Sequence, residues 1–137
     1  MKELHSFPNG SVQYDKDNFI ILMKFFGDIP SEVYKSIWRT AVDTVFDYGV
    51  EKIIIDQSGV THVPKRTRAW VVTSMYPKVK RDLSPDLAVS VVAASNPTQR
   101  SGVNYLVKGA RAISGFYIDF HKDYKASTEW LNSIHPS

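Results

Sequence analysis

Short apolar runs alternate with longer amphipathic stretches along most of this chain, and this alternation limits the possible folds more than any other feature. Residues 12–26 predict a β-hairpin, because two strand-like runs flank turn-forming residues at 15–18. Three further runs, at 52–56, 87–94 and 116–120, predict single buried strands. A hairpin followed by alternating helices and strands favours an α/β domain with a mixed, mainly parallel sheet of about five strands.

The stretches between these runs have the periodicity of helices that pack on a sheet. Apolar residues recur every three or four positions in 30–48, and Gly49 suits the left-handed end of that helix. After a loop at 57–64, a second helix is predicted for 66–76. Pro77 should kink or stop it, because proline lacks a backbone donor and clashes with the preceding turn. Asn96 and Asp123 are predicted to cap the last two helices.

The composition fits one globular domain covering residues 1–137, with 43% hydrophobic and 23% charged residues. The chain contains no cysteine, so disulfides, thiolate metal sites and cysteine nucleophiles are excluded. No apolar run approaches the ~18 residues that a membrane span needs. Residues 1–11 lack the apolar core of a signal peptide, which predicts a cytoplasmic protein.

The sequence contains no motif typical of catalysis or of cofactor binding. It has no phosphate-binding loop and no dinucleotide-binding glycine pattern, and its histidines lack metal-ligand spacing. Asp56 ends a predicted strand, where catalytic acids often stand, but we expect it to bond the amides of Ser58 and Gly59. We therefore predict no catalytic residue, cofactor or metal. An enzyme would gain support if Asp56 or Asp119 lay against a histidine in a cleft.

Lys65, Arg66 and Arg68 stand at the predicted start of the second helix. Cations there oppose the helix dipole, at a cost of about 0.3–1 kcal/mol each when exposed. A bound anion would relieve this cost, and ligands of open α/β sheets bind after the carboxyl end of a strand. We therefore predict that the three side chains bind an anion, either a free ligand or an acidic patch on a partner. The alternative is a solvated turn, paired with Asp56 or another surface acid.

On an ideal helix, Trp70 points away from the inward apolar face. An exposed tryptophan beside a basic helix start could anchor an interface, and the alternative is burial under the loop at 57–64 or the N-terminal segment. Lys78, Lys80 and Arg81 continue the basic character, but such charge runs are typically solvated. The net charge is only +3 and few aromatic residues lie among the cations, so nucleic-acid binding is not favoured.

Three segments at their particular spacing carry a resemblance to a known family. One strand ends in Phe-Phe-Gly-Asp-Ile at 25–29, and residues 53–61 read Ile-Ile-Ile-Asp-Gln-Ser-Gly-Val-Thr. The third segment, 120–131, ends in Trp130 and Leu131. Together they resemble the STAS domain, the fold of bacterial anti-sigma-factor antagonists (SpoIIAA-like proteins), whose strand and loop have a similar D-x-S-G-V pattern. The resemblance covers residues 12–131.

The resemblance implies a STAS-like fold and a role in protein interaction. In the antagonists of that family, a D-S-x-G stretch opens the next helix, and its serine is phosphorylated to switch partner binding. Residues 63–68 hold the corresponding position here and contain Thr67 but no serine. The resemblance therefore leaves the serine switch without support in this chain.

We predict from these observations a non-enzymatic regulatory or interaction module that binds a protein partner. Its proposed surface comprises the predicted loop and helix start, with Ser58, Gly59, Lys65, Arg66, Arg68 and Trp70. The alternative is a domain that binds an anionic or lipid-like small molecule, at the strand ends or between helices and sheet. Such a site could be lined by Phe25, Phe26, Phe116 and Tyr117. The sequence leaves the oligomeric state and the identity of the partner open.

Overall fold

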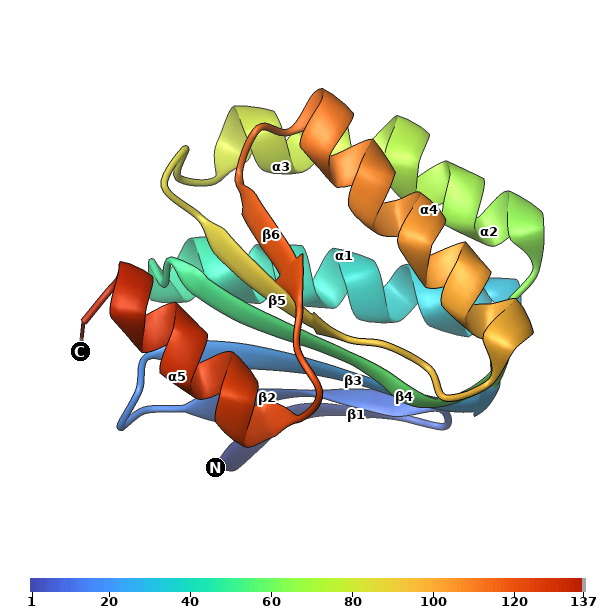
Figure 1. Cartoon of the computed structure of the whole chain (residues 1–137), viewed down its shortest axis with the longest axis horizontal. Helices are drawn as coiled ribbons and strands as arrows, with labels where there is room; N and C mark the ends of the chain where they lie inside the picture. Colours follow the sequence, from blue (N-terminus) through green and yellow to red (C-terminus); the bar gives the residue numbers. More distant parts are fainter. Residues whose placement is uncertain (137) are drawn as a thin grey trace.

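The computed structural model describes residues 1–136 and contains a six-stranded sheet. The strands lie side by side in the order in which they occur along the chain (Figure 1). They are β1 (Lys2–Phe7), β2 (Gly10–Asp15), β3 (Ile20–Asp28), β4 (Lys52–His62), β5 (Ala88–Val92) and β6 (Tyr117–Phe120). The first three strands pair antiparallel, whereas β3, β4, β5 and β6 pair parallel. The predicted mixed, mainly parallel sheet is confirmed.

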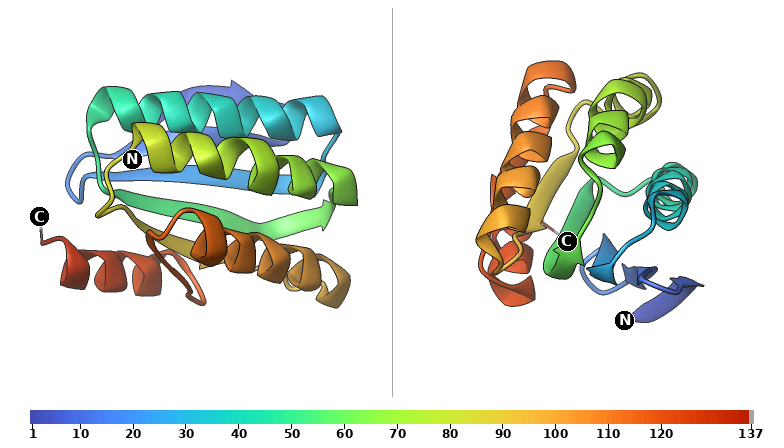
Figure 2. Two further views of the ribbon diagram at one scale, coloured as in Figure 1. Left: turned by 90° about the horizontal axis from the view of Figure 1, so that it is seen from above. Right: turned by 90° about the vertical axis from the view of Figure 1, so that its right-hand side faces the viewer.

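Helices cover the two faces of the sheet unequally. They are α1 (Ser31–Tyr48), α2 (Lys65–Trp70), the π-helical η1 (Val71–Met75), α3 (Tyr76–Asp82), α4 (Pro97–Ile113) and α5 (Tyr124–Ile134). All but α5 lie on one face, and α5 lies on the other (Figures 1 and 2). Because right-handed crossovers join strands that always advance in one direction, every crossover helix falls on the same face. α5 follows the last strand and covers the face that the crossovers leave open.

Two apolar cores result from this arrangement. The larger lies under the crossover helices, and the smaller lies under α5. Neighbouring residues of β3 alternate between them: Ile20 and Leu22 belong to the smaller core, and Ile21 and Met23 to the larger. This alternation explains why β3 is a continuous apolar run in the sequence, since a strand covered on both faces needs no polar side.

The structure extends the sheet beyond the prediction in two places. β1 forms an edge strand whose mostly polar, exposed residues give no strand-like apolar pattern. β4 continues to His62, so the predicted loop at 57–64 is wrong for most of its length. Its apolar run ends at Asp56, but β3 is long enough to keep pairing with it and sets Phe26 opposite Gly59. Strand pairing of this kind depends on a distant partner and leaves no local signal.

The helix that begins at Lys65 runs through α2, η1 and α3 to Asp82. Of the two effects expected of Pro77, the stop is wrong, because the helix continues past it, and the kink stays a prediction. The π-helical turn η1 ends at Met75, two residues before Pro77, and shifts the local pattern of backbone hydrogen bonds. This rearrangement accommodates a residue that lacks a backbone donor and would clash with a regular preceding turn.

The predicted helix ends are confirmed at three positions. Gly49 has φ 66° and ends α1 in the left-handed conformation. The Asn96 side chain accepts hydrogen bonds from the backbone of Thr98 and Gln99 at the start of α4. Asp123 accepts one from the backbone nitrogen of Ala126 at 2.9 Å.

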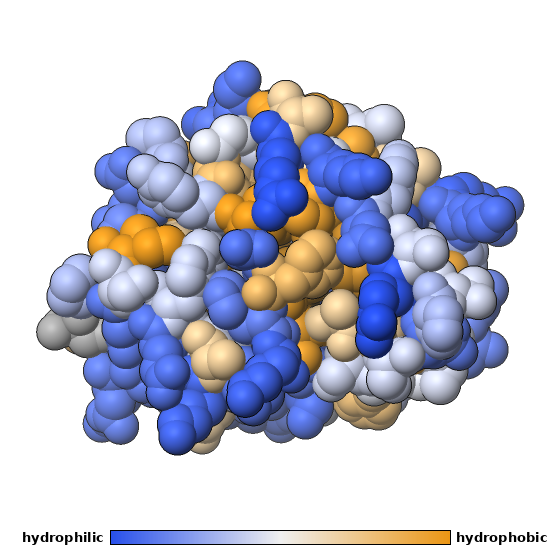
Figure 3. All heavy atoms as spheres, viewed as in Figure 1, coloured by the Kyte–Doolittle hydropathy of each residue, from blue (hydrophilic) through white to orange (hydrophobic). Residues whose placement is uncertain are grey.

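The molecular surface is largely polar on the side that carries β6 and α5. Hydrophilic residues cover most of this face, and apolar residues show near its middle (Figure 3). Within residues 1–136, no helix has both the length and the hydropathy that crossing a bilayer requires.

Candidate functional site

The three predicted anion-binding residues lie at the start of α2, directly after β4. Lys65 and Arg66 are exposed there, whereas Arg68 is buried with only 4% of its surface accessible. None of the three forms an ion pair with a carboxylate of residues 1–136. Asp56, the acid considered as their partner, instead accepts hydrogen bonds from the backbone and hydroxyl of Ser58. The fold therefore leaves these positive charges unpaired.

Arg68 is inserted between α2 and α4. Its Nη2 donates to Oε1 of Gln99 at 3.0 Å, and its Nε is buried without a hydrogen-bond partner. Gly102 provides the space for the guanidinium, because a Cβ atom at this position would overlap Arg68 Nη1. A guanidinium has five N–H donors, and the protein does not provide an acceptor for each of them here.

Two further buried polar residues lie on the inner side of Arg68. Gln57 donates from Nε2 to the hydroxyl of Tyr34 at 3.0 Å, and both residues are fully buried. Burial raises the pKa of Tyr34, and the Gln57 hydrogen bond and the positive charge of Arg68 oppose that shift. The Gln57 Oε1 atom is also buried without a partner. Tyr34 stays neutral, so it does not supply the negative charge that Arg68 lacks.

Arg68 and Lys65 line an open cleft of about 680 Å³ between α2 and α4. α2 and the end of β4 contribute His62, Val63, Lys65, Arg68 and Ala69, and α4 contributes Thr98, Gln99, Ser101, Gly102 and Tyr105. The wall is mixed, with apolar surface from both helices and no carboxylate among the lining residues. We refer to it as the α2–α4 cleft. It is a concave, cationic and partly apolar site.

The sequence identified only part of this cleft. Lys65 and Arg68 are in it, but Gln99, Gly102 and Tyr105 of α4 gave no signal of their own. A polar Gln99 next to the Asn96 cap could be interpreted as a first-turn surface residue, although it is 5% exposed. The contact between α2 and α4 joins segments that are far apart in the chain, so no spacing rule could predict it.

The other predicted surface residues lie outside the α2–α4 cleft. Arg66 is exposed, Gly59 packs against Phe26, and Ser58 lines a different cleft at the ends of the parallel strands. Trp70 is half-buried and packs against the larger core. The residues predicted to form one binding surface therefore lie at several separate positions in the structure.

Trp70 is covered by α1 rather than by either segment considered in the sequence. Lys35 Nζ lies 5.4 Å from the centre of a Trp70 ring, and Arg39 Cζ lies 5.0 Å from it. Cation–π contacts of this kind contribute about 0.5–1 kcal/mol at exposed sites. Trp70 therefore helps to join α1 and α2 and leaves part of its surface accessible.

Thr67 stands beside these residues but cannot be reached by a modifying enzyme in this conformation. It is fully buried, and its hydroxyl donates to Ser31 Oγ at 2.8 Å. The bond joins the first turns of α2 and α1. Its position supports a structural role.

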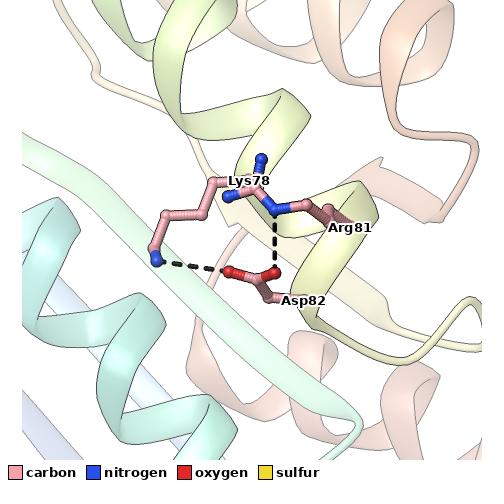
Figure 4. A network of polar contacts seen from close by, with 3 residues as sticks. All are labelled: Lys78, Arg81 and Asp82. Atoms are coloured by element: carbon pink, nitrogen blue, oxygen red, sulfur yellow. Dashed lines mark hydrogen bonds and ion pairs between the residues drawn. The ribbon is translucent and has the colours of Figure 1, made fainter.

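The second basic run differs from the first because two of its three cations, Lys78 and Arg81, are paired with a carboxylate, whereas Lys80 is exposed. Lys78 and Arg81 hold the Asp82 carboxylate between them, at 3.2 and 3.0 Å (Figure 4). Hydrogen bonds from Arg81 and Lys78 lower the pKa of Asp82. A local acid therefore compensates part of this run, and its remaining charge is exposed to solvent, as expected for a charged surface.

Neither Asp56 nor Asp119 forms a hydrogen bond or ion pair with a histidine within residues 1–136, which is the contact that would have supported an enzyme. Asp56 bonds Ser58, while Asp119 accepts from the backbone of Phe120 and lies 3.6 Å from Arg111. The expected bond from the Ser58 amide to Asp56 is confirmed, whereas the Gly59 amide, within the described residues, makes no such bond. In residues 1–136, no group of three or more histidine, aspartate or glutamate side chains is arranged to hold a metal ion.

The phenylalanines and tyrosine considered for a ligand cavity do not form one. Phe25 and Phe116 are buried in the larger core, whereas Phe26 and Tyr117 are exposed. The interior void that Phe116 lines has a volume of about 20 Å³, enough for a water molecule but not for an organic ligand. The open α2–α4 cleft is the better candidate for a ligand site.

Comparison with known proteins supports the fold. No protein-family model matches the sequence, and no curated protein matches it significantly. A solved structure from Shewanella loihica PV-4, an uncharacterised protein of the DUF3478 family with a SpoIIAA-like fold, is similar with a TM-score of 0.59. The identity is 15%, and the match covers 93% of this chain and 98% of that one. The chain therefore has a STAS-like, SpoIIAA-like fold, as its sequence predicted.

Proposed function

We propose that this domain is a non-enzymatic binding module that holds an organic carboxylate in the α2–α4 cleft. The observation that carries the proposal is Arg68, a residue that is 4% exposed and whose guanidinium has no ion pair with any carboxylate of residues 1–136. Burying a charge costs several kcal/mol unless an opposite charge compensates it. A carboxylate at the floor of the cleft would supply that charge, and its geometry matches the planar donors of a guanidinium.

The remaining wall of the cleft indicates what the anion should carry. Val63, Ala69 and Tyr105 present apolar surface, and Lys65 adds one exposed cation near the entrance. The volume of about 680 Å³ lies within the roughly 300–1,000 Å³ of small-molecule sites. These features favour a carboxylate with a compact apolar body over a fully polar anion.

Calorimetric titration with 4-phenylbutyrate, an aromatic carboxylate, tests the proposal. We expect saturable binding of this probe and none of its uncharged amide, because the amide lacks the charge that Arg68 requires. Lys65→Glu should weaken binding about tenfold by placing a like charge beside the carboxylate. Arg66→Glu is the matched control, since Arg66 is exposed on the same helix turn but does not line the cleft.

Three results would contradict the proposal. The first is equal binding of the acid and the amide, and the second is an equal effect of the two charge reversals. The third is the absence of saturable binding by 4-phenylbutyrate together with native mass spectrometry that finds no organic acid in the purified protein. Native mass spectrometry thus extends the test to carboxylates whose shape differs from that of the probe.

An acidic protein partner is the second candidate, as the sequence suggested. The observation that favours it is the cationic surface on α1 and α2, where Lys35 and Arg39 flank Trp70 and Arg66 is exposed. A partner on this surface would depend on Arg39 and Arg66, whereas a ligand in the cleft depends on Lys65 and Arg68. Arg39→Glu with Arg66→Glu should abolish partner binding and leave the binding of 4-phenylbutyrate unchanged. Co-purification from cell extract, with the double variant as control, measures the first effect.

A further inference from the structure

A second cleft, of about 560 Å³, opens at the carboxyl ends of β4, β5 and β6. Ser58, Ser95, Arg100, Asn104, His121 and Lys122 supply its polar wall. Arg100 and Asn104 come from α4, but neither lines the α2–α4 cleft. The carboxyl edge of parallel strands is where open α/β sheets usually bind ligands. This edge therefore needs its own explanation.

His121 is the most strongly positioned residue of this second cleft. Its Nδ1 lies 2.7 Å from the hydroxyl of Ser90, which donates to Ser127 at 2.6 Å. Both serines are fully buried. The Trp130 ring also packs against the His121 imidazole, with 4.7 Å between the ring centroids. Because Nδ1 is occupied by the interior, Nε2 is the ring nitrogen left to contact a ligand.

The charged residues that line the cleft beside His121 are positive. Arg100 and Lys122 are exposed and form no ion pair within residues 1–136, and no carboxylate lines the cleft. Arg100 uses Nε for a long bond to the carbonyl of Ala94, 3.4 Å, which leaves its terminal nitrogens for other contacts. Burial lowers the pKa of His121, against the opposing charge of Asp119. An anion in the cleft would raise that pKa again.

We propose that this second cleft binds the phosphate group of a small phosphorylated ligand. A phosphate monoester carries about two negative charges at neutral pH and several strong acceptor oxygens. Arg100 and Lys122 match that charge, and Nε2 of His121, when protonated, donates to a phosphate oxygen. Ser95 and Asn104 add neutral hydrogen-bonding groups, while Val92 and Phe120 provide an apolar wall for the organic part. The proposal does not depend on the carboxylate site, which has its own cations.

Nuclear magnetic resonance of the His121 ring protons tests this proposal, with phenyl phosphate and inorganic phosphate as probes at constant ionic strength. We expect both probes to shift the His121 signals saturably, and phenol, the uncharged analogue, to leave them unchanged. The Arg100→Gln and Lys122→Gln double variant should bind both phosphates about tenfold more weakly. Lys108→Gln and Lys125→Gln form the matched control, because both residues are exposed and line neither cleft.

Several outcomes would overturn the phosphate site. They are an absence of saturable shifts, an equal response to phenol, or equal phosphate affinity in the double variant and its control. The Lys65→Glu variant separates this proposal from the carboxylate site. It should weaken 4-phenylbutyrate binding about tenfold and keep the phosphate response, and an equal weakening of both would show that the second cleft has no independent site.

Discussion

Two groups of buried and half-buried polar residues lie on opposite faces of the sheet and differ in how completely their hydrogen-bonding groups are satisfied. Under α5, Asp15 accepts hydrogen bonds from the Tyr124 hydroxyl, the Asn18 side chain and nearby backbone amides. Asn132 of α5 accepts from Lys52 at 2.8 Å and donates to Asn18 at 3.0 Å. We call these five residues the α5 network. Its members bond mainly to one another and close the gap between α5 and the sheet.

The opposite face contains the group formed by Tyr34, Gln57, Arg68 and Gln99, which we call the Arg68 group. It has one cation, no carboxylate and two buried polar atoms without partners, Gln57 Oε1 and Arg68 Nε. It also borders the open α2–α4 cleft. A complete network contributes to stability, whereas an incomplete one beside a cleft is more easily explained by a missing partner. This contrast identifies the α2–α4 cleft as the functional candidate.

The largest predicted effect concerns the α5 network. Asp15→Ala should lower the free energy of unfolding by about 3 kcal/mol, because it removes charge-assisted hydrogen bonds and takes away the acceptor of the Tyr124 hydroxyl. Urea denaturation measures the change. Asp17→Ala is the control, since that residue is exposed on the neighbouring turn. A loss below about 1 kcal/mol would show that the network is not a main source of stability.

The pH dependence of stability should show the same network. Burial alone would raise the pKa of Asp15, but hydrogen bonds from Tyr124, Asn18 and Asp17 outweigh it and lower that pKa. A lowered folded-state pKa means that Asp15 stabilises the fold above its unfolded pKa of about 3.9. This contribution is lost as the pH falls from there through the folded-state pKa. The difference in unfolding free energy from Asp15→Asn should shrink over that acid range, and a constant difference would contradict the assignment.

Arg68→Met, unlike Asp15→Ala, should change stability little and ligand binding strongly. We expect its unfolding free energy to change by no more than about 1 kcal/mol, or to increase, because the substitution removes an uncompensated buried charge and retains much of the apolar stem. Binding of 4-phenylbutyrate should be lost. Denaturation and calorimetry on the same preparation test both statements. A strong destabilisation would mean that Arg68 belongs to the framework, as Asp15 does.

Gly102→Ala should have a smaller effect on stability and a selective effect on binding. The new Cβ atom would displace the Arg68 guanidinium, which is the end of a flexible side chain and can move. We expect affinity for 4-phenylbutyrate to fall about fivefold, while the helical preference for alanine partly offsets the lost contact. Gly109→Ala is the matched variant on α4, where the new atom meets Val72 instead. Equal affinities of the two variants for 4-phenylbutyrate would show that displacement of Arg68 does not cause the loss of binding.

The elements that were predicted well are those whose signals are local. The apolar periodicity of α1, the buried run of β5 and the caps at Asn96 and Asp123 depend on residues within one or two turns. β1 and the second half of β4 were missed because pairing with a distant strand, and not their own composition, determines them. The helix extended past Pro77 because η1 changed the backbone pattern before it.

The amino-acid sequence by itself determined the order of the elements from β2 onward, the fold class and the unusual cations at the start of α2, since each follows from neighbouring residues. Only the tertiary structure decided which of those cations matters. It placed Arg68 against Gln99 and Gly102 of another helix, left Lys65 in the same cleft and left Arg66 outside it. Burial and the lack of an opposite charge are properties of the surroundings in space, so they depend on contacts between residues that the chain keeps far apart.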